Sequence, residues 1–578
     1  MRACARLVSV LLAACLLLLA ARPAKSITWF VPSAECPTIQ SGLDRAGSGD
    51  EVQVAAGRYH EILFWPFQNG IVLRGAGTDS TSVVGDGEVS VLYFADVVQI
   101  DSTTVIEQIR FCHGGDAGVV IYGCAPKFEG FAVDSTAAGP GICCAAGSEA
   151  CFRSGEIRWN SGNALLLDGC GPSLTVSGCL ISQNGPGHAI LCQNGSGSRL
   201  VANTIRGTIS GTGIHGENSS PEIVGNIITG NDKGGIFLSW SNSLVRDNDV
   251  TANSIASESG AGISIFGGSP QIISNRIVGN TTSMYGGGLL LSSSSALISG
   301  NQIAGNQAGY GGGIGTAQSH DRIVDNEILD NTATGLGGGI SAGNSNLIIQ
   351  GNLIGRNHAS RGAGIEASDP YGSPVIRENR VVENDAWGDG GGISIVGGSA
   401  TVQFLGNTVA GNHSGGNGGG YCFASGTSVL SQETVAANHA DGSGDGLYTI
   451  STSPTVSGCN IADNGWGVHN ASYQIIPDLR GNWWGDLTGP WHQANPAGQG
   501  DSLSIYAWNF VPWLAHPDTT APPPPPRNLA ILEAGPTSLR LAWDPLVLDD
   551  LSGYRVYIDS DSSGFPYATH IDVGNVHE

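Results

Sequence analysis

Seven charged residues in the middle of the chain could supply proton-transfer chemistry. They are Asp325, Glu327, Asp330, Arg356, Glu378, Arg380 and Glu383. Carboxylates grouped with arginines can act as general acids and bases, or can hold Ca²⁺ beside a proton to be abstracted. Asp330, Arg356 and Glu383 recur at matching positions in acid–base–acid order, and ion pairing between neighbouring strands explains that order without catalysis. We therefore favour ion pairing. Asp325, Glu327, Arg356, Glu378, Arg380 and Glu383 remain the candidate catalytic residues, with Ca²⁺ as the cofactor of a lyase and otherwise no cofactor.

A second group has aromatic side chains at one repeated position. Tyr285, Tyr310, Leu336 and Arg361 each come directly before a glycine-rich triplet, and Trp387 lies two residues further out in its longer loop. Aromatic faces in line suit stacking against sugar rings, although tyrosines at such positions also pack over neighbouring turns. Tyr285, Tyr310, Arg361 and Trp387 are therefore the candidate ligand-binding residues.

A third group contains three histidines, each directly after an asparagine. His358 and His413 are 55 residues apart, and His413 and His439 are 26 apart, so the second pair could approach within about 5 Å on adjacent coils of a solenoid. A metal ion would need a third ligand, for which Asp441 is the nearby candidate. We favour solvent-exposed histidines in turns, and no metal site is predicted.

These groups are placed by a repeat. A phrase of the form Asn-x-(Ile/Val)-x-x-Asn has its first asparagine at 226, 248, 275, 301, 326, 352, 379 and 407, with spacings of 22 to 28 residues. A fixed period of this length is typical of solenoids. Asparagines at matching positions would stack about 4.8 Å apart and hydrogen-bond along the axis, so we interpret them as structural.

A glycine-rich segment upstream keeps step with each asparagine phrase. The segments end at Ile263, Leu289, Ile314, Ile340, Ile365, Ile393 and Tyr421, and short runs with apolar residues at alternate positions lie between the two landmarks. Such runs predict strands, and none is long enough for a crossover helix. The fold class is therefore all-β: a single-stranded, right-handed parallel β-helix with three strands per coil and about fourteen coils between residues 50 and 490.

Both ends of a solenoid need covers, because the first and last strands have unpaired edges. At the start, residues 37–47 carry Ile39 and Leu43 four positions apart, which predicts a short capping helix. At the end, the aromatic segments 481–490 and 506–513 could close the last coil.

The N-terminal sequence and the net charge indicate where the protein is located and which partners are disfavoured. Residues 1–26 have the basic start, apolar core and small-residue end of a secretory signal peptide. Their removal takes away four basic residues and moves the formal net charge from −24 to −28, which argues against nucleic acid and anionic surfaces as partners. We expect a secreted or cell-surface monomer with no transmembrane span after processing. Eleven cysteines remain, and disulfides between neighbouring coils are possible.

The C-terminal part has a different composition. The β-helix is expected to span residues 27–516, and the proline-rich segment 517–527 predicts a stiff, extended linker. Residues 528–578 resemble the first strands of a fibronectin type III domain, an immunoglobulin-like β-sandwich, with Trp543 and Tyr554 in its core. About half of such a domain is present, so the sequence is either a fragment or is followed by further modules.

The repeat region resembles a known superfamily. The order TIQSGLDRAGSGDEVQVAAGRYHE (38–61), GIVLRGAG (70–77) and VVGDG (83–87), with NWWG…GP at 482–490, is similar to the pectin-lyase-like, right-handed β-helix proteins. The resemblance implies the fold; members include polysaccharide lyases, polygalacturonases, alginate epimerases and adhesin-like surface proteins. The polygalacturonase motifs are absent, and DPYG at 369–372 lacks the histidine of the epimerase motif. We therefore predict an exported protein that binds a polysaccharide or cell-surface glycan. The alternative is a polysaccharide lyase or glycoside hydrolase with an unrecognised site.

Overall fold

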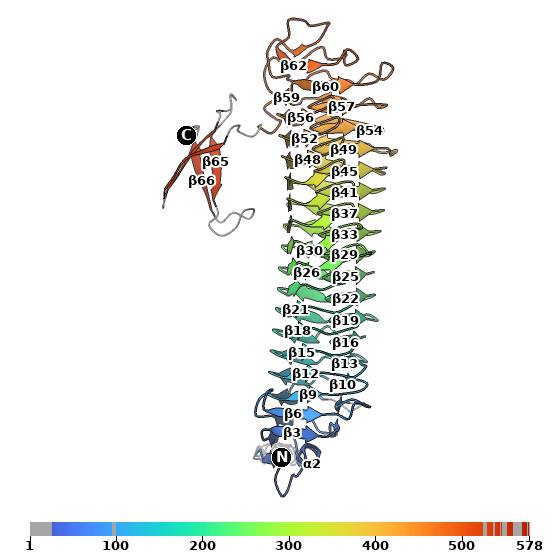
Figure 1. Ribbon diagram of the computed structural model, residues 1–578, viewed down its shortest axis with the longest axis vertical. Coiled ribbons are helices and arrows are strands. Elements are labelled where there is room, and N and C mark those ends of the chain that lie inside the picture. Colours follow the sequence, from blue (N-terminus) through green and yellow to red (C-terminus); the bar gives the residue numbers. More distant parts are fainter. Residues whose placement is uncertain are drawn as a thin grey trace, which may run out of the picture. The chain divides into compact units, whose positions relative to one another are not determined.

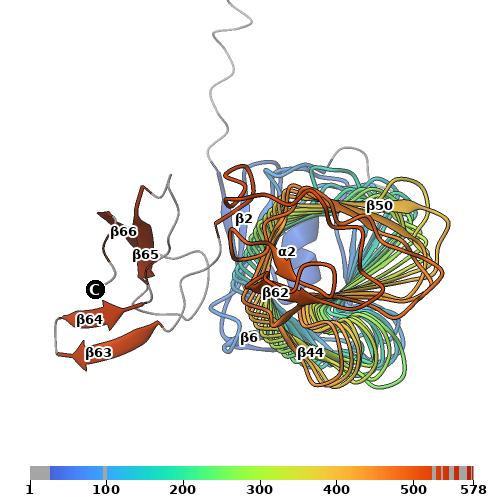
Figure 2. The ribbon, with the colours of Figure 1, turned by 90° about the horizontal axis from the view of Figure 1, so that it is seen from above.

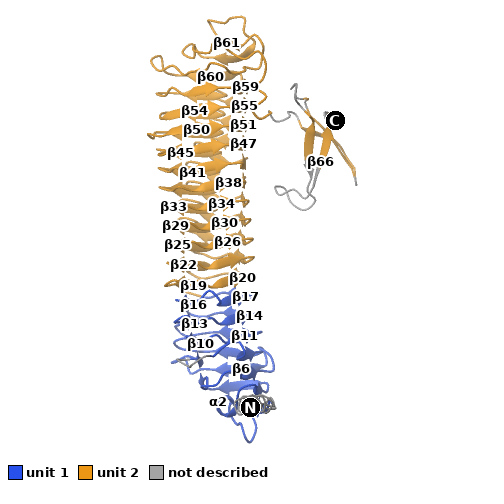
Figure 3. Cartoon of the chain, turned by 180° about the vertical axis from the view of Figure 1, so that it is seen from behind, with its two compact units in different colours: residues 1–184 blue, residues 185–578 orange. Residues whose placement is uncertain are grey.

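The structure is a computed structural model of two compact units, residues 1–184 and 185–578 (Figure 3). The residues that it describes are 26–94, 100–523, 529–535, 538–543, 545, 552–558, 569–574 and 576. The predicted fold class is confirmed, because the described chain forms a parallel β-solenoid of about 17 coils with one helix. The predicted fourteen coils are too few. The coils before residue 160 do not carry the asparagine phrase, which makes them harder to count from the sequence.

The coils of the first unit have three strands each. One coil consists of β11 (Lys127–Glu129), β12 (Ala132–Asp134) and β13 (Ile142–Ala145). Each pairs in parallel with the corresponding strand of the next coil: β14 (Cys151–Arg153), β15 (Glu156–Arg158) and β16 (Leu165–Asp168). Middle residues point inward, so Phe128 and Phe152 stack in the core with ring centroids 5.2 Å apart. Stacking of identical positions thus builds the core along the axis.

Eight coils of the second unit contain a fourth strand that the sequence did not predict. A representative coil consists of β38 (Arg322–Val324), β39 (Glu327–Leu329), β40 (Thr332–Ala333) and β41 (Ile340–Gly343). We call the sheets that contain them A, B, D and C in that order (Figures 1 and 2). Sheet D runs from β28 (Ser254–Ile255) to β56 (His439–Ala440). Its two-residue strands are too short to show alternation, which is why the pattern missed them.

The asparagines form two hydrogen-bonded ladders in the second unit, as predicted. The N–H and Nδ2 of Asn301 both donate to Oδ1 of Asn326, each at 2.9 Å, and Nδ2 also donates to the Ile272 carbonyl at 2.8 Å. The first ladder contains Asn203, Asn226, Asn248, Asn275, Asn301, Asn326, Asn352, Asn379 and Asn407. The second contains Asn231, Asn253, Asn280, Asn306, Asn331, Asn357, Asn384, Asn412, Asn438 and Asn464. These amides are buried and bonded from coil to coil, which links adjacent coils.

The left-handed corner residue is the one before each asparagine rather than the asparagine itself. Glycine often fills it, as at Gly300 with φ 63°, but Asp325 (φ 54°) and Glu378 (φ 57°) occupy it before the first ladder. Before the second ladder it is held by Asp330, Arg356 and Glu383, with φ of 55°, 52° and 56°. A side chain at such a corner projects away from the coil. Five of the seven charged candidate residues are therefore corner residues.

The glycine segments keep step with the asparagines because the two touch. A Cβ on Gly287 would lie 2.5 Å from the Gly312 carbonyl oxygen, and a Cβ on Gly288 would lie 2.6 Å from that of Gly313. The same Cβ on Gly288 would approach Nδ2 of Asn306, in the second ladder of the next coil, to 3.0 Å. The backbone segments of successive coils thus pack too closely for any side chain.

Both predicted end covers are present. Helix α2 (Ile39–Arg45) buries Ile39 and Leu43 and begins with a Thr38 capping box. At the other end Trp484 and Phe510 are buried around β62 (Gly500–Leu503). These apolar side chains cover the ends of their units, as an open solenoid end requires.

The segment after residue 516 contacts the coils before the C-terminal strands begin. Nδ2 of Asn460 donates to the Asp518 carbonyl at 2.9 Å, and Nε2 of Gln432 donates to Thr520 at 2.9 Å. Two antiparallel pairs follow: β63 (Ala530–Ala534) with β64 (Leu539–Ala542), and β65 (Tyr554–Ile558) with β66 (Thr569–Gly574). Trp543 contacts Tyr554 edge-on at 5.2 Å. The fibronectin type III module remains a prediction.

Other sequence expectations concern covalent links and membranes. The eleven described cysteines form no disulfide, and most of them are buried in the solenoid. Among the described residues, no helix has the length and apolar character needed to cross a membrane. Apart from Ser26, the predicted signal peptide lies outside the described residues.

Candidate functional site

The charged group lies on sheet B and its two corners, and it contains the ion pair between Asp330 and Arg356. Arg356 donates through Nε and Nη2 to the two carboxylate oxygens of Asp330, at 2.9 Å each. The preferred ion-pair interpretation is confirmed for this pair, which is half exposed and contributes little to stability. Asp325 and Asp330 flank a strand, and a five-residue extended segment separates their Cα atoms by about 16 Å. The group therefore forms two columns.

The other predicted catalytic residues have separate surroundings. Glu378 accepts a hydrogen bond from Nε2 of Gln350 at 2.8 Å, on the exposed corner. Glu327 and Arg380 both align with Leu353 in sheet B, two coils apart from each other, but Glu327 is buried whereas Arg380 is exposed. These environments differ too much for the residues to be treated as one acid–base set.

The predicted ligand-binding residues differ in how accessible their side chains are. Tyr285 and Tyr310 form a parallel bridge in the loops between sheets D and C, with stacked rings 4.8 Å apart and 45% and 38% exposed. Trp387 is also exposed. Arg361 instead turns toward the solenoid and donates through Nη2 to Oε1 of Glu366 at 3.0 Å. Tyr285, Tyr310 and Trp387 are thus accessible to a ligand, whereas the Arg361 guanidinium is engaged.

Further aromatic residues lie on the strands of sheet C and at the C-terminal ends of these strands, and the sequence analysis missed them. Phe237 belongs to β25 (Ile236–Ser239) and Phe266 to β29 (Ile263–Phe266), and their rings are 5.6 Å apart. Trp240, directly after β25, is 67% exposed. The parallel register places these residues within two coils of Tyr285. Phe266 is the last residue of its strand and Trp240 directly follows its strand, so the signal was available as aromatics at strand ends, where no glycine landmark draws attention.

A buried acid lies on the outer row of the same sheet. Glu366 in β45 (Ile365–Ser368) accepts hydrogen bonds from Arg361 and from the Ser368 hydroxyl, the latter at 2.5 Å. Burial raises the pKa of this carboxyl, and the bonds to Ser368 and Arg361 oppose that rise. In register it lies between Ser341 and Ser394. It anchors the loop that carries Arg361.

The histidines of the third group share one row on sheet D. His358, Asp385, His413 and His439 are the first residues of β44 (His358–Ala359), β48 (Asp385–Ala386), β52 (His413–Ser414) and β56, and they align in register. The His413 and His439 rings stack at 5.6 Å, close to the approach that their spacing predicted. Sequence analysis missed Asp385, which follows its asparagine just as the histidines do.

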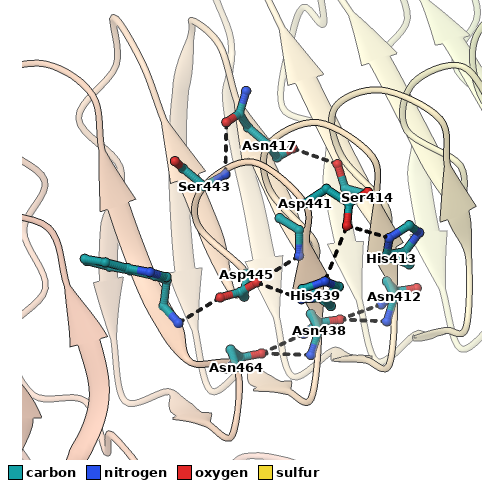
Figure 4. Close-up of polar contacts among 12 residues, drawn as sticks. Asn412, His413, Ser414, Asn417, Asn438, His439, Asp441, Ser443, Asp445 and Asn464 are labelled. Atoms are coloured by element: carbon teal, nitrogen blue, oxygen red, sulfur yellow. Dashed lines mark hydrogen bonds and ion pairs between the residues drawn. The ribbon is translucent and has the colours of Figure 1, made fainter.

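Five side chains of this row and its following loop form a connected cluster, of which Figure 4 shows His413, His439, Asp441 and Asp445. Nε2 of His413 and Nε2 of His439 each lie 3.5 Å from the same Oδ1 of Asp441. On their other sides, Nδ1 of His413 is 2.7 Å from Asp385, and Nδ1 of His439 is 3.3 Å from Asp445. The hydrogen bond to Asp385 raises the pKa of His413. We call these five residues the His–Asp cluster.

Comparison with known proteins assigns the solenoid to a family. A family model described as "Right handed beta helix region" matches residues 97–281 and 246–409, which together exceed half of the chain. The chain belongs to this β-helix family. No curated protein matches it. The family assignment agrees with the resemblance to pectin-lyase-like proteins at the level of fold.

Several solved structures are similar to parts of this chain at low sequence identity. The mannuronan C-5 epimerase AlgE6 A-module of Azotobacter vinelandii is 14% identical, with 64% of this chain and 92% of that chain covered and a TM-score of 0.22. A mannuronic acid specific family 6 lyase from human gut microbiota is 12% identical, with 70% and 87% covered and a TM-score of 0.28. A catalytic domain of GH87 α-1,3-glucanase with nigerose is 12% identical, with 67% and 65% covered and a TM-score of 0.26. Likenesses this distant carry no argument about activity.

Proposed function

We propose that this protein is an exported or cell-surface β-helix that binds a polysaccharide or surface glycan along sheet C of its second unit. The observation that carries the proposal is the exposed, stacked pair Tyr285 and Tyr310. Phe266 and Trp240, at the C-terminal ends of two strands of sheet C, add exposed aromatic side chains. Exposed aromatic side chains gathered over adjacent coils are the feature that sugar recognition uses.

The solenoid suits a linear polymer, because equivalent positions recur from one coil to the next. Tyrosine hydroxyls at neighbouring coils offer hydrogen-bonding groups at a regular spacing, and the ring edges offer apolar contact. The strongly negative net charge of −24 opposes binding of polyanions. The proposed ligand is therefore a neutral polysaccharide.

The predicted signal peptide, linker and fibronectin-like segment are consistent with the same proposal. Export would bring the coils to extracellular glycans, and a C-terminal module would act as a spacer or an anchor. The enzymatic alternative has less support, because Arg356 is paired with Asp330 and Glu327 is buried.

Binding to immobilised neutral polysaccharides, measured on a glycan array and by interferometry, tests the proposal. We expect the Tyr285→Ala, Tyr310→Ala double variant to bind about tenfold more weakly, since loss of two aromatic contacts costs about 1–2 kcal/mol. Tyr122→Ala, which removes an exposed aromatic residue of the first unit, is the matched control and should bind as the parent does. Absence of binding by the parent, or equal binding by the double variant, would overturn the proposal.

The same samples separate binding from catalysis. Release of unsaturated or reducing oligosaccharides from a bound polymer would indicate a lyase or hydrolase. Loss of that release in an Arg380→Ala, Glu378→Gln variant would assign it to sheet B, and binding without release supports a non-enzymatic role.

A further inference from the structure

The His–Asp cluster has an arrangement that ion pairing alone does not require. One ring nitrogen of each of two histidines points to a common carboxylate oxygen of Asp441, at 3.5 Å each. The ligand atoms of His413, His439 and Asp441 all lie within 4.8 Å of one another. Two imidazoles and one carboxylate form a donor set that suits zinc and similar divalent metals, with further positions left for water or another ligand.

Carboxylates behind the rings complete the arrangement. A metal-bound histidine commonly donates its second ring N–H to a carboxylate, which sets the tautomer and the ring orientation. His413 has Asp385 in this place, 2.7 Å from Nδ1, and His439 has Asp445, 3.3 Å from Nδ1. With both Nδ1 atoms protonated, both Nε2 lone pairs face Asp441. The order of contacts is therefore carboxylate, histidine, common centre, histidine, carboxylate.

The backbone holds this geometry firmly. The N–H groups of His413 and His439 donate to the carbonyls of Asn384 and Asn412 at 2.8 and 2.9 Å. The backbone of both histidines is therefore held by residues of the second ladder. Asp445 is buried and accepts hydrogen bonds from the N–H groups of Ala440 at 2.8 Å and Trp466 at 2.9 Å. A site on paired strands with a fixed supporting carboxylate is preorganised for binding.

The charges of the cluster also favour a cation. Asp385, Asp441 and Asp445 surround two imidazoles, and His358 contacts Asp385 at 3.4 Å from the far side. With neutral histidines the cluster carries about three negative charges and no lysine or arginine contact among those described. A bound divalent cation would offset most of this charge.

We propose that His413, His439 and Asp441 bind one divalent transition-metal ion, with zinc as the probe, and that Asp385 and Asp445 orient the two histidines. The site lies on sheet D and the loop that follows β56, on other coils than the proposed glycan-binding residues Tyr285 and Tyr310. Its role is independent of that function, so either proposal can fail without the other.

Zinc titration of the metal-free full-length chain at pH 7.5, followed by calorimetry and by metal content after dialysis, tests the site. We expect saturation at one equivalent. His439→Ala should weaken binding at least 100-fold, and Asp385→Asn, which retains all three ligands, should weaken it about 10-fold. His320→Ala removes a histidine outside the cluster and should bind zinc as the parent does.

Two controls exclude misfolding and zinc binding by cysteine. Thermal unfolding of metal-free His439→Ala should match that of the parent, because this side chain is 66% exposed, so lost binding cannot be assigned to misfolding. Cobalt in place of zinc should give visible bands without thiolate charge-transfer absorption, which separates the site from the buried cysteines. No saturable binding, thiolate absorption, or unchanged affinity in His439→Ala would overturn the proposal.

Discussion

In the coils between Asn226 and Asn412 each ladder amide bonds to another amide. In the coils between Glu433 and Asp501 a carboxylate ends each ladder. In the earlier coils each ladder amide receives two hydrogen bonds from one neighbour and donates to the other, as Asn326 does with Asn301 and Asn352. In the later coils carboxylates take over. Oε1 of Glu433 accepts from the N–H and Nδ2 of Asn407 at 2.9 and 3.0 Å, and Asp501 accepts from both groups of Asn464.

This difference shows why amides fill the ladders and acids end them. An amide is both donor and acceptor, so it can be repeated indefinitely, whereas a carboxylate only accepts when ionised. Both terminal acids are buried, and burial raises the pKa of Glu433 to about 8 and raises that of Asp501. Tyr421 donates its hydroxyl to Glu433. The amide ladders of the earlier coils should therefore be insensitive to pH, whereas the carboxylates that end the ladders in the later coils should make those ends sensitive to it.

The largest expected effect is a break in the amide ladder. Asn326→Leu leaves the buried N–H of Asn301 without its acceptor, so we expect a loss of about 2–4 kcal/mol in unfolding free energy, at about 1–3 kcal/mol for the orphaned group plus the lost bonds. Hydrogen exchange should show reduced protection near residues 301–352, because solenoid stability is a sum of neighbour terms. Gln307→Leu, on an exposed site of the adjacent strand, should have little effect. Uniform loss along the whole solenoid would contradict the ladder model.

A glycine substitution tests the close packing between the glycine segments of successive coils. In Gly288→Ala the new Cβ would meet the Gly313 carbonyl oxygen at 2.6 Å, and this oxygen belongs to backbone that cannot move aside. We expect a loss of about 1–3 kcal/mol, the usual range for overpacking, measured by chemical denaturation. Gly343→Ala is the control, because Gly343 is not left-handed either and the nearest atom to an added Cβ there is the Thr316 carbonyl oxygen at 4.0 Å. Equal losses in the two variants would mean that the close packing of the coils at Gly288 is not what excludes the side chain.

A change at Glu433 should remove pH dependence from the later coils. Because its folded pKa of about 8 lies above the ordinary 4.5, the folded state retains a proton that the unfolded state loses between these values. This contribution to stability is complete below about pH 4.5 and declines as pH rises toward 8, by up to about 1.4 kcal/mol per pH unit.

In Glu433→Gln the amide still accepts from Asn407, and the Tyr421 hydroxyl can turn to accept from it. Unfolding free energies measured from pH 5 to 9 should therefore vary less in this variant than in the parent, with the Asp501 contribution retained. A pH profile identical to that of the parent would show that Glu433 is ionised throughout in the folded state.

The smallest effect is expected at the surface. Asp330→Asn removes the charge partner of Arg356, and both side chains are about half exposed, so we expect a change of about 0.5 kcal/mol or less. Thermal unfolding at low and high salt would measure it. A change as large as that of Asn326→Leu would mean that corner ion pairs, and not the buried amides, link the coils.

The first ladder continues beyond Glu433 into the C-terminal cover. Cys459 occupies a first-ladder position after Glu433, and its N–H donates to Oδ1 of Asn482 at 3.0 Å. The ladder therefore resumes within the aromatic segment that the sequence predicted as a cover. Trp484, two residues later, is fully buried. The end of the second unit thus combines an amide bond to the last coil with an apolar lid.

The repeat in the sequence was sufficient to determine the solenoid, the two ladders and the alignment of His413 with His439. A constant period makes residues at matching positions neighbours, whatever the rest of the chain does, so these contacts follow from counting. The period also predicted that Asp330 and Arg356 would meet. The terminal covers followed from the same logic, because unpaired strand edges must be covered.

Only the tertiary structure decided how side chains and loops use that scaffold. The fourth strand, the inward turn of Arg361 toward Glu366 and the burial of Glu433 against Tyr421 depend on packing that no repeat spacing encodes. The convergence of two Nε2 atoms on Asp441 depends on the path of a loop and on the carboxylates behind each ring. The period specifies which backbone positions are adjacent, but rotamers, loop paths and local burial are settled by three-dimensional packing and hydrogen bonding.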